Sequence, residues 1–153
     1  MTKAAPFAGR CLKMRSDLIS KELEDLKNAL TLLQASIKKF TPYKIRKVYT
    51  PDELEYYDSL SFRFEKSIEL MLSFFKGIEI FAYAKTSDTL RDRLLVMQKL
   101  NIIDDIDFWF EARTLRNRIA HTYIREELKD IYEEIYKKSK IIFKTFKRIE
   151  NYL

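Results

Sequence analysis

Glycine, proline and cysteine are all scarce in this chain. Its 153 residues include two glycines, three prolines and one cysteine. Glycine and proline are the usual formers of tight turns, so their scarcity argues against a fold of many short strands. Cys11 stands alone, so no disulfide can form within the chain. It is also far in sequence from the one histidine, so we expect no metal site and no cofactor.

Long apolar runs are absent too. The longest hydrophobic stretches fall far short of the roughly 20 residues that a membrane-spanning helix needs. The stretch 1–15 carries Lys3, Arg10, Lys13 and Arg15, no acidic residue, and no apolar block of the kind found in secretory signals. We expect residues 1–15 to be a disordered basic leader, and the protein to be cytoplasmic without membrane association.

Helix-forming and charged residues dominate what remains. The chain is 46% hydrophobic and 34% charged, and its 29 basic residues exceed 23 acidic ones to give a net charge of +6. Its length suits one domain with a proper core. The composition predicts a single all-α domain over residues 16–153. The modest basic excess permits a polyanionic partner such as RNA without requiring one.

Hydrophobic periodicity predicts an up-and-down antiparallel bundle of about five helices. Apolar residues alternate at four- and three-residue spacing over about 16–39. A capping box, Thr50-Pro51-Asp52-Glu53, begins a second helix that runs to about Tyr83. Its broad apolar stripe suits a central helix or a dimer interface, and Gly77 within it indicates close helix approach. Further helices are expected over about 90–100, from Asp104 or Asp105 to about 120, and over about 126–151.

The only histidine, His121, ends the expected fourth helix. Arg116 lies five residues before it and Tyr123 two residues after it. An imidazole titrates near neutrality, so His121 is suited to proton transfer on a phosphate ester. Arg116 carries a fixed charge and a fork of donors that matches phosphate oxygens. This pair is the candidate catalytic set.

Three neighbours are candidates for supporting roles. Asn117 is placed to orient the imidazole or to hold a phosphate oxygen, and Arg113 and Arg118 add positive field for an RNA backbone. The plain alternative is structural. Basic residues and asparagine are favoured at helix C-termini by the helix dipole and by carbonyl capping.

The spacing of Arg116 and His121 restricts how they can act together. On a straight helix, residues four apart share a face, as Asn117 and His121 do, whereas residues five apart diverge. Arg116 and His121 can therefore meet one phosphate only if the helix ends or distorts between them. The other possibility is that two copies of the segment face each other across a dimer.

The segment from Arg113 to Tyr123 resembles the Arg-x4-His-x-Tyr motif of the HepT toxins, a branch of the HEPN all-helical ribonucleases. The likeness extends from about Leu18 to the C-terminus. It includes the stretches SFRFEK (61–66), TLRDRL (89–94), KLNIIDDIDFWFEAR (99–113) and LRNRIAH (115–121).

The resemblance implies a toxin that is a metal-independent endoribonuclease. In that family the fold is a dimeric helical bundle with two motifs lining one cleft. The implied partner is an MNT-type nucleotidyltransferase antitoxin, which would transfer AMP to Tyr123 and join the homodimer in a larger hetero-oligomer. An alternative is a non-catalytic helical subunit that serves as the substrate-binding partner of a small nucleotidyltransferase. A third possibility is a helical dimer with no nucleotide role.

Arg63 and Glu65 lie on the second expected helix, near the expected dimer seam. We expect an exposed ion pair between them, which would contribute little stability. A buried pair, or a place in the cleft, is the alternative.

Overall fold

A computed structural model describes residues 6–153 of the chain. Within this range the regular structure is entirely helical. The helices are α1 (Pro6–Lys38), α2 (Pro51–Tyr83), α3 (Leu90–Lys99), α4 (Ile106–Ile119) and α5 (Arg125–Tyr152). This confirms the predicted all-α fold.

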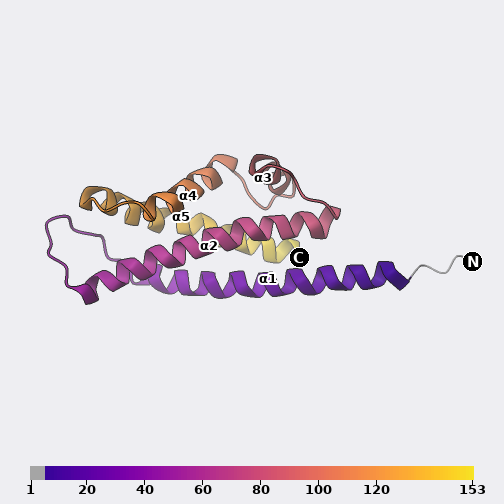
Figure 1. Ribbon diagram of the computed structural model, residues 1–153, viewed down its shortest axis with the longest axis horizontal. Coiled ribbons are helices and arrows are strands. Elements are labelled where there is room, and N and C mark those ends of the chain that lie inside the picture. Colours follow the sequence, from indigo (N-terminus) through magenta and orange to yellow (C-terminus); the bar gives the residue numbers. More distant parts are fainter. Residues whose placement is uncertain (1–5) are drawn as a thin grey trace, which may run out of the picture.

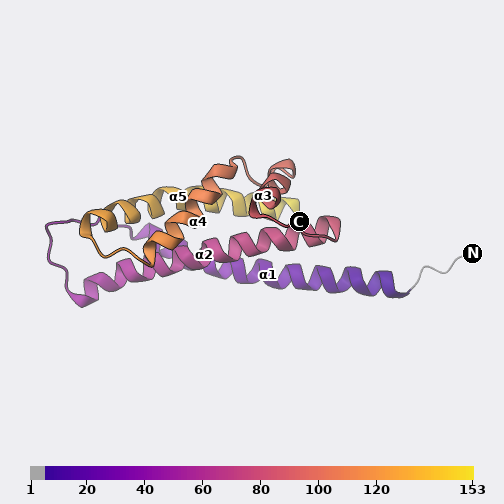
Figure 2. The same ribbon diagram turned by 45° about the horizontal axis from the view of Figure 1, so that its top comes forward.

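The helices pack as an antiparallel up-and-down bundle. α1 and α2 form a long hairpin, α4 and α5 pack against α2, and α5 also contacts α1 (Figures 1 and 2). Short α3 packs at the C-terminal end of α2 (Figures 1 and 2). α2 contacts each of the other four helices. Most of its apolar stripe is buried within the chain, as expected of a central helix, but Leu54 and Phe81 near its two ends are exposed.

The start of α1 differs from the expectation. The predicted first helix began near residue 16, after a disordered leader, but α1 begins at Pro6. Proline is favoured at the first helical position, and the residues that follow it include good helix formers. Residues 6–15, predicted as part of the leader, thus belong to α1, and the first five residues of that leader lie outside the described range. The first turns of α1 extend past the end of α2 (Figure 1).

The capping box that begins α2 is confirmed. Thr50 Oγ1 accepts a hydrogen bond from Glu53 N at 3.3 Å, and Glu53 Oε2 accepts one from Thr50 N at 2.9 Å. Glu53 also pairs with Lys47 at 3.0 Å. The hydrogen bond from the Thr50 backbone, helped by Lys47, lowers the pKa of the Glu53 carboxyl. The box satisfies backbone groups that the first turn of α2 would otherwise leave unpaired.

A cluster of tyrosines holds the loop between α1 and α2. Five ring pairs stack or meet edge to face with centroids 4.6–5.7 Å apart, and they are formed by Tyr43, Tyr49, Tyr57 and Tyr132. Tyr57 Oη donates a hydrogen bond to Thr41 O at 2.8 Å. Burial is the main reason why the pKa of Tyr132 rises to about 12. These contacts fix the loop against the start of α5.

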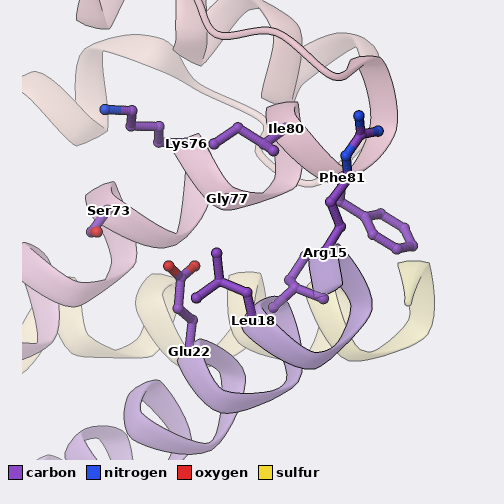
Figure 3. A pocket seen from close by; sticks show the side chains of 9 residues that line it. Arg15, Leu18, Glu22, Ser73, Lys76, Gly77, Ile80 and Phe81 are labelled. Carbon is purple, nitrogen blue, oxygen red and sulfur yellow. The ribbon is translucent and has the colours of Figure 1, made fainter. Parts of the chain in front are cut away.

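α1 and α2 approach closely at Gly77, as its position in the sequence indicated. A Cβ added at Gly77 would lie 2.5 Å from Glu22 Oε2. Figure 3 shows the Glu22 carboxylate directed from α1 toward α2 at this point. Glu22 Oε2 is buried and has no hydrogen-bond partner among the described residues. Burial, with a smaller contribution from Asp25, raises the pKa of Glu22 above its ordinary value.

A buried polar network joins the end of α2 to α3. Glu79 is 2% exposed and accepts hydrogen bonds from Ser87 N at 3.1 Å, from Ser87 Oγ, and from Arg93 Nε at 3.0 Å. Arg93 Nη2 also donates to Ser87 O at 3.1 Å. Burial alone would raise the pKa of Glu79, but the hydrogen bonds from Ser87 and Arg93 lower it below its ordinary value. The network fixes the direction in which the chain leaves α2.

Candidate functional site

The candidate motif is positioned by the buried face of α4. Asp105 begins the helix by accepting a hydrogen bond from Asp107 N at 2.9 Å, so the second of the two predicted caps is the one used. The buried residues of the helix are Phe108, Trp109, Ala112 and Leu115. Their burial against the bundle sets the rotation of α4 and leaves Arg116 half-buried at the edge of the core.

α4 ends between Arg116 and His121. Its last helical residue is Ile119. The chain then turns, with His121 N donating to Arg118 O at 3.1 Å and Thr122 Oγ1 donating to the same oxygen at 2.8 Å. Of the two arrangements that the spacing permitted, the structure contains the first, a helix that ends between the two residues.

One pocket gathers most of the motif. It has a volume of about 350 Å³ and is lined by Glu65 and Glu69 of α2 and by Arg116, Asn117, Ala120 and His121. Arg116 and His121 therefore share a pocket within a single chain. Arg116 Nη2 donates a hydrogen bond to Asn117 Oδ1 at 3.4 Å, so the nearest partner of Asn117 is the arginine.

The pocket contains both signs of charge. Burial raises the pKa of Glu65, Arg116 opposes the rise, and Glu69 adds to it. Arg116 and Glu65 thus influence each other electrostatically, although no ion pair within 4 Å joins them in the part of the chain described. A guanidinium, an imidazole and two carboxylates on one concave surface can bind a phosphate and exchange protons with groups attached to it.

Three of the expected site residues lie outside this pocket. Arg113 is exposed on α4. Arg118 pairs with Glu134 of α5 at 3.1 Å, with both side chains about 40% exposed. Tyr123 is 88% exposed in the short segment between α4 and α5, and it does not line the pocket.

The expected ion pair between Arg63 and Glu65 is wrong. Arg63 Nη1 instead donates to Ser36 Oγ at 2.7 Å and to Leu32 O at 3.2 Å, both on α1. Residues two apart on a helix point to different sides, so Arg63 faces α1 while Glu65 faces the motif. Glu65 lies in the motif pocket of the single chain. Glu69 was missed, although its position one turn after Glu65 was a signal for it.

Within residues 6–153 no group of three or more His, Cys, Asp or Glu side chains is placed to hold a metal ion. None of the helices described is both long enough and apolar enough to span a bilayer.

The family of the chain follows from its sequence over nearly its whole length. Residues 21–152 match the model of the family described as nucleotidyltransferase substrate binding protein like. This chain belongs to that family. No curated protein and no solved structure matches it. The matched range of this nucleotidyltransferase substrate binding protein-like chain contains every residue that lines the motif pocket.

Proposed function

We propose that this chain is the toxin of a HEPN/MNT toxin–antitoxin pair and cleaves RNA without a metal ion. The observation that carries the proposal is the shared pocket of Arg116 and His121. The family description, which refers to a nucleotidyltransferase, supports a partner of that class. The resemblance of residues 113–123 to the HepT motif supports the toxin role.

The chemistry is attack of the RNA 2′-oxygen on the adjacent phosphorus. The P–O5′ bond breaks, and the products are a 2′,3′-cyclic phosphate and a 5′-hydroxyl. His121 exchanges the protons that this step requires. Arg116 stabilises the negative charge that develops on the phosphate oxygens, and Asn117 helps to hold its guanidinium. Arg113, exposed nearby on α4, and Arg118 supply positive field for the rest of the RNA backbone.

Silencing would occur at Tyr123. Its side chain is 88% exposed, so a nucleotidyltransferase can reach its hydroxyl without unfolding the bundle. The tyrosine oxygen attacks the α-phosphorus of ATP, and pyrophosphate leaves. The product carries an anionic phosphate and a bulky nucleoside two residues from His121, and both oppose the approach of RNA.

The proposed active form is a homodimer that the antitoxin joins in a larger hetero-oligomer. This part of the proposal rests on the resemblance. One chain already brings Arg116 and His121 together, so the chemistry itself does not require a residue from a second copy.

A non-catalytic role is the second candidate. The family description names substrate binding rather than cleavage. In that case the chain is the partner subunit of a small nucleotidyltransferase, and the motif pocket binds a phosphate group without breaking a bond.

The test is RNA cleavage by the purified protein in excess EDTA. Wild type is expected to cut, while His121→Ala and Arg116→Ala are expected to lose activity. Lys99→Ala, which removes a positive charge at an exposed position of α3, is the matched control and should cut normally. If wild type does not cut but a nucleotidyltransferase labels it with AMP, and Tyr123→Phe abolishes the labelling, the partner-subunit role stands. Equal cutting by wild type and His121→Ala would refute the assignment of His121.

A further inference from the structure

Two carboxylates line the same pocket as the motif. Glu65 and Glu69 are one helical turn apart on α2 and line the same hollow as Arg116 and His121. A pocket that only binds phosphate is expected to be lined by donors and positive charge. Carboxylates oppose a phosphate, so their presence here needs a chemical reason.

The two carboxylates differ in their surroundings. Glu65 is half-buried and Glu69 is exposed. Burial, opposed by Arg116 and reinforced by Glu69, raises the pKa of Glu65 and makes it a stronger base than a solvated carboxylate. Of the pair, Glu65 is therefore the one whose surroundings suit it to accept a proton.

The geometry of the cleavage favours two proton-transfer groups on opposite walls. In an in-line displacement the attacking 2′-oxygen and the departing 5′-oxygen lie on opposite sides of the phosphorus. Glu65 lines the pocket from α2, and His121 lines it from the turn that follows α4. α2 and α4 lie side by side (Figures 1 and 2). A single imidazole would have to serve both sides in turn.

We propose that Glu65 is the general base of the cleavage and that His121 is the general acid. This assignment rests on the proposed ribonuclease function and divides between two residues the roles that His121 would otherwise fill alone. The Glu65 carboxylate takes the 2′-hydroxyl proton as the oxygen attacks phosphorus. The His121 imidazolium gives its proton to the 5′-oxygen as the P–O5′ bond breaks. Exchange with water then removes the proton from Glu65 and restores the one on His121.

Arg116 has two tasks in this arrangement. It stabilises the phosphate oxygens, and its charge opposes the rise in the pKa of Glu65. Glu69 acts through Glu65, because its charge strengthens the base. Glu69 is a positioning residue rather than a catalytic one.

The test compares two RNA substrates in excess EDTA. One is ordinary RNA, and the other carries sulfur in place of the bridging 5′-oxygen, so that its leaving group departs without a proton. Glu65→Gln and His121→Ala should each lower kcat/KM on ordinary RNA by about 10²–10⁴-fold. On the sulfur substrate His121→Ala should regain most of its activity, whereas Glu65→Gln should not. The acid limb of the pH profile of kcat/KM should flatten in Glu65→Gln.

The control is Glu55→Gln, an exposed glutamate on α2 away from the pocket, which should leave cleavage unchanged. Circular dichroism establishes that each variant is folded. Full activity of Glu65→Gln, or its recovery on the sulfur substrate, would overturn the assignment while leaving the ribonuclease function intact. A loss in Glu69→Gln with none in Glu65→Gln would overturn it as well. Absence of cleavage by wild type would overturn both the function and the assignment.

Discussion

Removal of Glu79 should destabilise the bundle more than removal of any exposed carboxylate. The Glu79 side chain is 3% exposed and that of its partner Arg93 is 17% exposed. Truncating one member of a buried pair leaves the other charge uncompensated, which costs about 3–5 kcal/mol. Because Arg93 retains some contact with water, we expect Glu79→Ala to lower the free energy of unfolding by an amount near the lower end of this range, about 3 kcal/mol. For a chain of this size that corresponds to a fall in Tm of about 6–12 °C.

The matched control is Glu134→Ala, which removes an ion pair whose side chains are 42% and 39% exposed. Such a pair contributes about 0–1 kcal/mol. The assay is urea and thermal unfolding followed by circular dichroism for wild type, both single variants, Arg93→Ala, and the double variant Glu79→Ala with Arg93→Ala. The double variant should be little less stable than Glu79→Ala alone, because it no longer contains an unpaired buried charge.

The pH dependence provides an independent check. The pKa of Glu79 is lowered on folding, so its contribution is present above its ordinary pKa of 4.5 and is lost as the pH falls through the folded value. The difference between wild type and Glu79→Ala should therefore shrink in acid. Equal losses in Glu79→Ala and Glu134→Ala, or additive losses in the double variant, would refute the reasoning.

Two further variants test other parts of the fold. Glu22→Gln should stabilise the protein at pH 7, because the pKa of Glu22 is raised on folding and its buried charge costs stability once the pH exceeds that pKa. The urea midpoints of variant and wild type should converge below pH 4.5. Glu24→Gln, at an exposed position of α1, serves as the control. A lower midpoint for Glu22→Gln at pH 7 would contradict this. Thr50→Ala should cost about 1 kcal/mol by breaking the capping box at the start of α2, and unchanged urea unfolding would show that the box contributes nothing.

Local signals in the sequence predicted the helices well where capping and periodicity coincide. The capping box at Thr50 predicted the start of α2, and the acidic residues before Ile106 predicted the start of α4. The start of α1 was missed. Its first turns extend beyond α2, so no strong apolar seam marks them, and the helix there follows from Pro6 and local propensity alone.

The candidate site was predictable only in part. The residue types of Arg116 and His121 indicate their chemistry. Whether one chain brings them together depends on where α4 ends, and their spacing permitted either a helix end between them or a dimer. Glu65 and Glu69 are remote from the motif in sequence, so their place beside it depends on how α2 packs against α4. In the same way, the partner of Arg63 proved to be Ser36, on a different helix.

The loop anchored by tyrosines has a consequence for the segment that carries Tyr123. Arg125 Nη1 donates to Ile45 O at 3.3 Å, across 80 positions of sequence, so the start of α5 is tied to the loop between α1 and α2. The end of α4 is fixed by its buried face. The non-helical link between these two fixed points is only residues 120–124. At about 3.3–3.6 Å per residue, the Tyr123 Cα cannot move more than about 7 Å from that of His121. Any group attached to Tyr123 is therefore held on a short tether to His121, so its local concentration around that residue stays high however freely the ring rotates.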